Sequence, residues 1–276
     1  MPELPEVETT RLHLEPALVG RRIVGVEVRH PRMVRRQPFP ADFGGRMQGR
    51  TIERLRRHGK FLMADLSGDL VWVTHLGMSG RISLTEPDAP YVPHSNVVVG
   101  VEGGTEMRFV DPRTFGFVVV YTPEELDASS LGGLGPDALT DLPGAAELQR
   151  RLTGRTAPIK ALLLDQGLIA GLGNIYADEA LHRARISPLR PGGSVDRAEA
   201  GRLRLAIRRT LADGLRWGGT SLDDLAYLLP DGRAGEFTSR LRAYGREDEP
   251  CGVCGTPIRR TVVRSRSTHW CPTCQP

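Results

Sequence analysis

The chain has 276 residues and a mass of 30.3 kDa, with 37 Lys and Arg against 33 Asp and Glu, so its net charge is +4. Only Lys60 and Lys160 are lysines, and arginine supplies the rest of the positive charge. A hydrophobic content of 39% excludes a disordered chain, and no apolar run approaches the ~18 residues of a membrane helix. The acidic start MPELPEVETT lacks the basic-then-apolar order of a signal peptide. We therefore expect a cytoplasmic protein whose thiols are reduced.

The first part of the chain is predicted to be a helix followed by a β domain. Residues 2–18 favour a helix, because Pro2 suits a first turn, glutamates favour its N-terminal end and Gly20 ends it. From about 21 to 122, short segments rich in Val and aromatic residues are separated by Gly or Pro, and 103–104 is a Gly-Gly hairpin turn. Many short strands without helices between them predict an antiparallel β-sandwich domain over 1–126.

The second part of the chain is predicted to be helical. Residues 127–145 are rich in Gly, Pro and Ser and are expected to be a linker. Apolar residues spaced three and four apart then predict a helical domain over 146–235, with helices at 146–152, 159–170, 174–184 and 198–217.

The junction at 168–176 joins two of these helices through a glycine turn. Its G-x-G pattern follows a helix, so it is not a dinucleotide-binding fingerprint, and a compact helix–turn–helix is expected. Asn174 stands at an N-cap position, and the N–H groups of the helix start are suited to hold a phosphate. Simple capping by Asn174 is an equal alternative.

All four cysteines lie in the last 26 residues, at 251, 254, 271 and 274. The spacing C-x2-C-x16-C-x2-C predicts one structural Zn²⁺ bound by Cys251, Cys254, Cys271 and Cys274, with no open coordination position. The alternatives are two disulfides or unrelated thiols. Four arginines and no acid lie between the two pairs, in a predicted β-hairpin with Val262 and Val263 in a strand. A positive finger over 236–276 favours a polyanion partner, although a solvated basic tail would show the same charge.

The N-terminus carries a candidate nucleophile. Removal of Met1 would leave Pro2 with a free secondary amine, and an α-amino group has a pKa of about 7.7–8.0 against about 10.4 for lysine. Attack of this amine on a sugar C1′ gives a cationic iminium, which acts as an electron sink for elimination after loss of a C2′ proton. Glu3 is placed to be the acid/base group. Pro2 also has a structural interpretation as a first-turn residue.

Seven motifs occur in the order found in the bacterial formamidopyrimidine-DNA glycosylases, and they span residues 2 to 274. They are MPELPEVETT, GKF with Lys60, HLGMSG, DPRTFG, IAGLGNIYADEAL, YGRE and the four-cysteine finger. The resemblance implies an α+β enzyme with two domains: a β-sandwich, then a helix–two-turn–helix domain with a zinc finger. It also implies a monomeric bifunctional DNA glycosylase and AP lyase of the bacterial nucleoid. Its partner would be double-stranded DNA, from which it removes 8-oxoguanine and formamidopyrimidines before cleaving the abasic site by β,δ-elimination.

The resemblance also implies roles for individual residues. Pro2 would be the nucleophile, Glu3 the proton-transfer group, and Lys60 a DNA contact that assists elimination. Asn174 and Arg264 would bind phosphates around the lesion, with His75 near them.

A base flipped out of the duplex leaves a gap, and the family fills this gap with residues that match Met78, Arg113 and Phe115. A thioether fills space, an aromatic ring wedges the stack, and a guanidinium satisfies the unpaired cytosine. Taken singly, Met78 would suit a strand core, Arg113 an ion pair with Asp111, and Phe115 sandwich packing.

Three positions depart from the family pattern or stay open. Thr114 replaces an arginine that is common there, and Glu236 replaces an aromatic residue in the loop 218–237, which would cover the flipped base. The role of Lys160 stays open.

Three other classes compete with this interpretation. The endonuclease VIII branch shares the architecture and prefers oxidised pyrimidines, but Leu4, Met78 and Phe115 favour the purine branch. A noncatalytic zinc-finger DNA-binding protein would have no use for Pro2, Glu3 and Lys60. A structural zinc module without nucleic acid leaves the arginine-rich finger unexplained.

Overall fold

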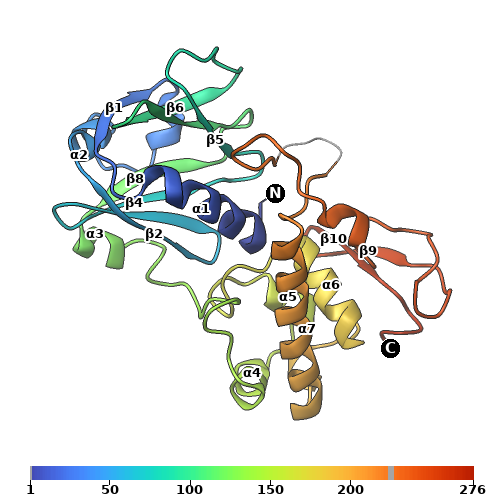
Figure 1. The fold of residues 1–276 in the computed structure, drawn as a ribbon. Helices are drawn as coiled ribbons and strands as arrows, with labels where there is room; N and C mark the ends of the chain where they lie inside the picture. Colours follow the sequence, from blue (N-terminus) through green and yellow to red (C-terminus); the bar gives the residue numbers. More distant parts are fainter. Residues whose placement is uncertain (1, 223–226) are drawn as a thin grey trace. The chain divides into compact units, whose positions relative to one another are not determined.

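The computed structural model describes residues 2–222 and 227–276, which form two compact units (Figure 1). The first unit comprises Met1–Gly133 and Trp217–Thr238, and the second comprises Leu134–Arg216 and Ser239–Pro276. The sequence-based boundaries differ, because they assign 217–235 to the helical domain. In the structure the described residues of this segment pack with the β domain through backbone contacts such as Leu84 N–H to Pro230 O (3.3 Å).

The first unit contains the predicted antiparallel β-sandwich. One sheet has the order β1-β6-β7-β5, with β1 (Ile23–Val28), β5 (Arg81–Thr85), β6 (Ser95–Val101) and β7 (Thr105–Val110). The other has the order β2-β3-β4-β8, with β2 (Ile52–His58), β3 (Phe61–Leu66), β4 (Leu70–His75) and β8 (Phe117–Tyr121). The Gly-Gly turn between β6 and β7 is confirmed, since Gly103 and Gly104 take φ of 95° and 76°. All described pairings within both sheets are antiparallel.

The main core of this unit lies between the sheets and under helix α1 (Leu4–Leu18). Alternate residues of β6 face inward, with Val97 and Val99 fully buried, as the period of two in a strand requires. Leu14 and Leu18 of α1 join the same cluster. Short helices complete the unit: η1 (Pro31–Val34), α2 (Asp42–Met47) and α3 (Pro123–Asp127).

Helix α1 starts later than the sequence predicted. Glu3 is its N-cap, and Pro2 lies before the helix, so the first-turn interpretation of Pro2 is wrong. The Glu6 carboxylate accepts the backbone N–H of Glu3 at 2.7 Å, which satisfies a donor at the helix start. At the other end Val19 is the C-cap, and Gly20 follows with φ of 80°.

The second unit packs helices against a two-stranded hairpin. Its elements are α4 (Ala145–Leu152), α5 (Ile159–Leu163), α6 (Asn174–Ala184), η2 (Gly192–Ser194), α7 (Arg197–Arg216), β9 (Arg259–Val263) and β10 (Arg266–Trp270); η3 (Phe237–Arg240) lies where the two units meet in sequence. The helix predicted over 159–170 ends at Leu163. Beyond that residue, Gln166 Nε2 donates hydrogen bonds to Leu164 O and Leu172 O, and Gln166 Oε1 accepts the Gly171 N–H. These bonds stabilise turns instead of a continued helix.

The hairpin β9–β10 is confirmed, including Val262 and Val263 in the first strand. Arg264 and Ser265 form its two-residue turn, with φ of 44° and 62°. Positive φ at both positions is the type I′ geometry that matches strand twist. Arg264 is therefore exposed at the tip of the hairpin.

A buried ion pair connects this hairpin to the helices. Lys160 Nζ lies 2.7 Å from Asp178 Oδ1, and both side chains are fully buried. Lys160 also donates to Ser267 O of β10 at 2.6 Å, and Asp178 Oδ2 accepts the His269 backbone N–H at 2.9 Å. The pair therefore links α5, α6 and β10, which gives Lys160 a structural role.

Among the residues that the structure describes, every helix is too short or too polar to span a membrane.

Replacing Lys160 by Met should lower the free energy of unfolding of the second unit by about 3–5 kcal/mol, because Asp178 then becomes a buried charge without its partner. Denaturant titration with zinc release as the readout measures the change. The matched control is Arg150→Gln in the exposed Arg150–Glu147 pair, where a loss below about 1 kcal/mol is expected. Equal losses in the two variants would contradict the assignment.

Candidate functional site

The predicted nucleophile and acid/base residue lie at a buried N-terminus. Pro2 and Glu3 are both buried, and Glu3 is the N-cap of α1. Glu6, 2% exposed, holds this segment through its bond to Glu3 N–H and accepts the Thr220 N–H with its other oxygen at 2.7 Å. The sequence showed Glu6 only as a helix-start acid. Its capping-box spacing from residue 3 was the signal for this role.

Residues of the segment 217–238 continue this network. The Tyr227 hydroxyl donates to Glu6 O at 3.3 Å, and Ser221 Oγ donates to Tyr227 O and accepts Gly235 N–H. Burial, followed by the nearby Glu6 charge, raises the pKa of Tyr227 above its usual range. Glu236 has an exposed side chain, and its N–H binds Trp217 O at 2.8 Å. Residues 223–226 of the predicted cover loop lie outside the described residues, as does Met1.

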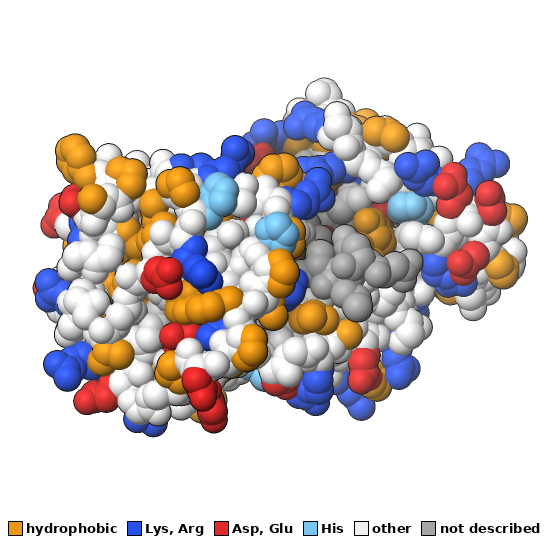
Figure 2. All heavy atoms as spheres, turned by 90° about the horizontal axis from the view of Figure 1, so that it is seen from above, with side chains coloured by type: hydrophobic (Ala, Val, Ile, Leu, Met, Phe, Trp, Pro, Cys, Tyr) orange, Lys and Arg blue, Asp and Glu red, His pale blue; other side chains and the backbone are white. Residues whose placement is uncertain are grey.

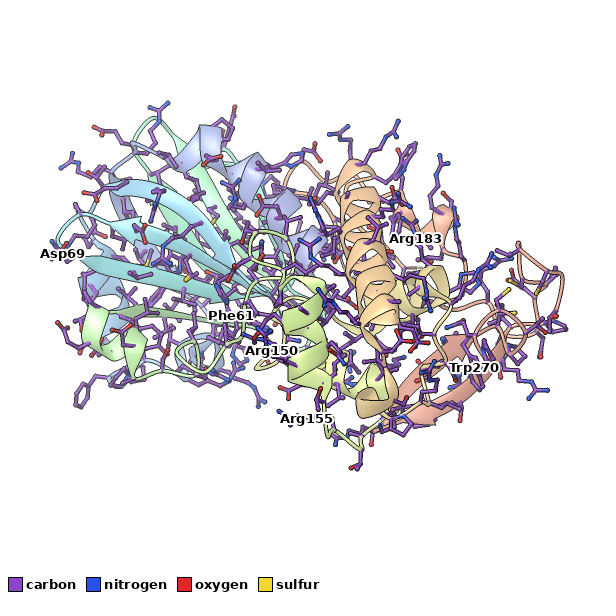
Figure 3. All side chains as sticks on the ribbon, turned by 90° about the horizontal axis from the view of Figure 1, so that it is seen from below. Phe61, Asp69, Arg150, Arg155, Arg183 and Trp270 are labelled. Atoms are coloured by element: carbon purple, nitrogen blue, oxygen red, sulfur yellow. The ribbon has the colours of Figure 1, made fainter. Side chains whose placement is uncertain are left out.

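Lys60 and His75 belong to the same sheet. Lys60, 8% exposed, lies in the turn between β2 and β3, after Gly59 with φ of 55°. His75 of β4 pairs with Phe61 and Phe117 across the strands. Its ring lies 4.9 Å from the Phe61 ring, which Figure 3 labels, and stacks on Phe117 at 5.5 Å. Lys60 is thus adjacent in sequence to Phe61, which forms an aromatic cluster with His75 and Phe117 at the strand ends.

His75 is held in its neutral form. Its Nδ1 accepts the Gly77 N–H at 3.1 Å, which places the ring proton on Nε2. Burial lowers the pKa of His75 to about 4, and the positive charges of Lys60, Arg36 and Arg35 act in the same direction.

The three predicted gap-filling residues lie on two neighbouring loops of the first unit. Met78 is in the turn between β4 and β5 and is half-buried, so it is not strand core. Phe115 is 43% exposed, which excludes plain sandwich packing. The exposed Arg113 has its guanidinium carbon 5.1 Å from the centre of the Phe115 ring. Its backbone N–H, instead of its side chain, contacts Asp111 at 3.3 Å.

Asp111 determines the shape of the loop that carries Arg113 and Phe115. It is fully buried, and its carboxylate accepts the Ser79 hydroxyl at 2.6 Å and the Gly116 N–H at 2.7 Å. The loop also contains Thr114 at φ of 53°, a strained position for a β-branched residue. Because Ser79 follows Met78, Asp111 connects both loops. From the sequence alone, Asp111 was predicted only as a possible partner for Arg113.

Asn174 and Arg264 belong to the second unit. Gly173, not Asn174, is the N-cap of α6, so the capping prediction is wrong by one residue. Asn174 instead donates from Nδ2 to Ser267 Oγ of β10 at 3.2 Å. This bond connects the start of α6 to the hairpin whose tip carries Arg264.

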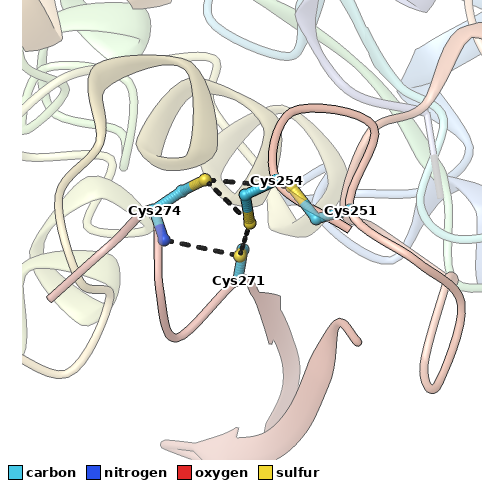
Figure 4. A group of neighbouring side chains, drawn as sticks. All are labelled: Cys251, Cys254, Cys271 and Cys274. Carbon is cyan, nitrogen blue, oxygen red and sulfur yellow. Dashed lines mark hydrogen bonds between the residues drawn. The ribbon is translucent and has the colours of Figure 1, made fainter. Parts of the chain in front are cut away.

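The four cysteine sulfurs converge (Figure 4) and lie within 4.8 Å of one another. Individual pairs are 3.9 Å apart for Cys251 and Cys274 and 3.4 Å apart for Cys254 and Cys271. Zn–S bonds of about 2.3 Å in a tetrahedron place sulfurs about 3.8 Å apart, so the cluster fits Zn²⁺. A disulfide requires about 2.05 Å, which excludes the paired-disulfide alternative in this structure.

The fold thus assembles the predicted residues as two sets. The first unit contains Pro2, Glu3, Lys60, His75, Met78, Arg113 and Phe115. The second unit contains Asn174, Arg264 and the four cysteines. On the face drawn in Figure 2, basic and acidic side chains are interspersed over much of the first unit.

His75 should remain neutral down to about pH 5, because its folded pKa of about 4 lies below the ordinary value of about 6.5. The folded state then binds fewer protons than the unfolded state between these values. The stability that neutral His75 contributes is complete above about pH 6.5 and is lost as the pH falls towards 4. NMR titration of the His75 ring, assigned with His75→Asn, measures the pKa. A midpoint near 6.5 would refute the prediction.

Family models match most of the chain. The formamidopyrimidine-DNA glycosylase N-terminal domain matches residues 1–118, and the H2TH domain of the same enzymes matches 134–225. A zinc finger found in FPG and IleRS matches 248–276.

Curated relatives and solved structures agree with these models. The formamidopyrimidine-DNA glycosylases of Thermus thermophilus and Geobacillus kaustophilus are 45% and 43% identical, and each alignment covers this whole chain and at least 98% of the relative. The crystal structure of the T. thermophilus MutM (Fpg) protein has a TM-score of 0.89 at 43% identity, covering 99% of this chain and 98% of that one. A Lactococcus lactis Fpg bound to DNA with an abasic site has a TM-score of 0.90 at 32% identity, with both chains fully covered. The chain belongs to the formamidopyrimidine-DNA glycosylase family.

Proposed function

We propose that Pro2, Glu3 and Lys60 are the catalytic residues of this DNA glycosylase and AP lyase. The enzyme removes oxidised purines, 8-oxoguanine and formamidopyrimidines, from duplex DNA and cleaves the resulting abasic site by β,δ-elimination. Solved relatives include Fpg complexes with DNA that contains Fapy-dG or an abasic site. The observation that carries the residue assignment is the buried Pro2–Glu3 segment bound by the Glu6 carboxylate.

The chemistry follows from a secondary amine held next to a carboxylate. After removal of Met1, the nitrogen of Pro2 attacks C1′, the bond from C1′ to the base breaks, and the base leaves with a proton. Ring opening of the sugar gives an iminium, which must be cationic because the amine is secondary. This cation stabilises the electrons released when the C2′ proton is removed, and the 3′ phosphate leaves. Glu3 is the group placed to exchange these protons.

Lys60 and His75 support this site in different ways. The ammonium of Lys60 neutralises charge that develops at the DNA during elimination, and its burial strengthens that effect. Neutral His75, with Nε2–H as donor, offers a hydrogen bond to a phosphate without adding a second charge next to Lys60.

Met78, Arg113 and Phe115 fill the gap left by the flipped nucleotide. The exposure of Phe115 and Arg113 supports this role, because an exposed ring and guanidinium on a braced loop are free to enter a base stack. Arg113 then donates to the orphaned cytosine. Asp111 keeps the loop rigid while the residues bind.

Asn174 and Arg264 bind phosphates near the lesion, and Zn²⁺ keeps the hairpin that carries Arg264 folded. A tetrathiolate site leaves no open position, so the metal is structural. By these roles the chain divides into catalysis in 1–126, a linker at 127–145, DNA binding in 146–235 and the finger in 236–276, with 217–238 belonging to the compact unit of the catalytic domain. Such an enzyme acts on chromosomal DNA, at the bacterial nucleoid.

Borohydride should trap a covalent complex of this protein with a duplex that contains 8-oxoguanine opposite cytosine, because the iminium is reducible. An N-terminal extension that blocks Pro2 should abolish trapping while the protein still binds DNA. Trapping by the blocked protein, or no adduct with the native protein, would refute the Pro2 assignment. A parallel duplex with an oxidised pyrimidine tests the endonuclease VIII alternative, which predicts stronger trapping there.

Chelation of Zn²⁺ should abolish binding to lesion DNA while the β-sandwich stays folded, because the cysteines lie in the other unit. Fluorescence anisotropy of labelled duplex measures binding, and the fluorescence of the buried Trp72, in a variant with Trp217→Phe and Trp270→Phe, reports on the sandwich. Readdition of Zn²⁺ is the control. Unchanged affinity after complete zinc removal would show that the finger is not needed for DNA binding.

A further inference from the structure

Helix α6 contacts the zinc finger through three side chains that lie on two successive turns. Asp178 binds β10, and Glu179 accepts the N–H groups of Arg242, Ala243 and Tyr244, which precede the first cysteine pair of the finger. The third is His182, in the last turn of α6, whose Nε2 lies 3.4 Å from Cys251 Sγ. His182 is 4% exposed and Cys251 2% exposed, so water does not compete at this contact.

The surroundings of His182 determine which ring nitrogen carries its proton. Nδ1 is buried and has no hydrogen-bond partner among the described residues. A proton on Nδ1 would therefore be an unsatisfied buried donor, and the Nε2 lone pair would face a thiolate. Only the Nε2–H tautomer gives a favourable contact, with the N–H donated to the Cys251 sulfur.

We propose that His182 is a positioning residue of the zinc site, which donates an N–H···S hydrogen bond to the metal-bound thiolate of Cys251 and lowers the reactivity of that sulfur. A zinc tetrathiolate carries about two net negative charges, and hydrogen bonds to its sulfurs disperse that charge. A sulfur that shares its lone pair with a donor is a weaker nucleophile towards oxidants and electrophiles.

The four sulfurs differ in burial and in the hydrogen bonds that they accept. Cys254 is exposed, whereas Cys251 and Cys271 are buried. Cys271 accepts the backbone N–H of Cys274 at 3.4 Å, a bond that lies within the finger. The bond from His182 comes from outside the finger. The stability of the metal site therefore depends on the packing of the finger against α6, the helix that also carries Asn174.

The test compares His182→Phe, which keeps a planar ring without the N–H, with His182→Gln, whose amide N–H₂ is able to replace Nε2–H. Both variants are prepared with Co²⁺ in place of Zn²⁺, and the thiolate-to-cobalt charge-transfer absorption is measured. Loss of the N–H···S bond raises the energy of the sulfur lone pair, so His182→Phe should shift this band to longer wavelength. His182→Gln should restore the native position. A purely structural role would not move the band.

A second measurement uses the zinc protein with N-ethylmaleimide, whose alkene carbon forms a thioether with the attacking thiolate. In His182→Phe, zinc release should be at least about tenfold faster, with Cys251 modified earlier than in the native protein as followed by peptide mass spectrometry. The initial modification rate of the exposed Cys254, measured before zinc leaves, is the internal control and should change little. Native band position and native release rate in His182→Phe would overturn the proposal. Equal changes in both variants would assign the effect to packing and would overturn it too.

Discussion

The Glu6 carboxylate is the interaction on which the N-terminal site depends. Its two oxygens accept N–H groups from Glu3 and from Thr220, residues more than 200 positions apart in sequence. One buried side chain thus fixes the position of Pro2 and Glu3 before the helix and anchors the segment 217–238 to the same unit. A terminal residue is ordinarily mobile, and a nucleophile must instead be held in place.

A second buried carboxylate holds the loop of Arg113 and Phe115 in place by accepting hydrogen bonds. Asp111 accepts side-chain and backbone donors, so the ends of the loop are fixed while its tip stays exposed. In the second unit, Asp178 and Glu179 hold the finger against α6 in the same manner. Buried acids that accept several N–H groups therefore support each of these three segments, for which we propose DNA contacts. Burial raises the pKa of Glu179 even though its three N–H partners favour the charged form.

The sequence predicted the sandwich, the long helices and the zinc cluster, because alternating Val-rich segments, helical spacing and cysteine pairs are local patterns. It failed where long-range contacts decide. The helix predicted through Gln166 ends at Leu163, since that side chain bonds backbone groups of a turn. Segment 217–235 was assigned to the helical domain, whereas its partner Glu6 lies near the N-terminus. Lys160 had no assigned role, because Asp178 and Ser267 are distant in sequence.

The central claim is that Glu6 holds in place the N-terminus that we propose as the nucleophile, and single-turnover borohydride trapping by Glu6→Gln tests it most directly. The amide would direct N–H₂ at one of two backbone donors and leave that donor unsatisfied, a change of about 1–3 kcal/mol, or a roughly 5- to 150-fold slower trapping rate. Glu15→Gln, in an exposed side chain on the same helix, is the control and should trap at the native rate. Native trapping by Glu6→Gln would contradict the claim.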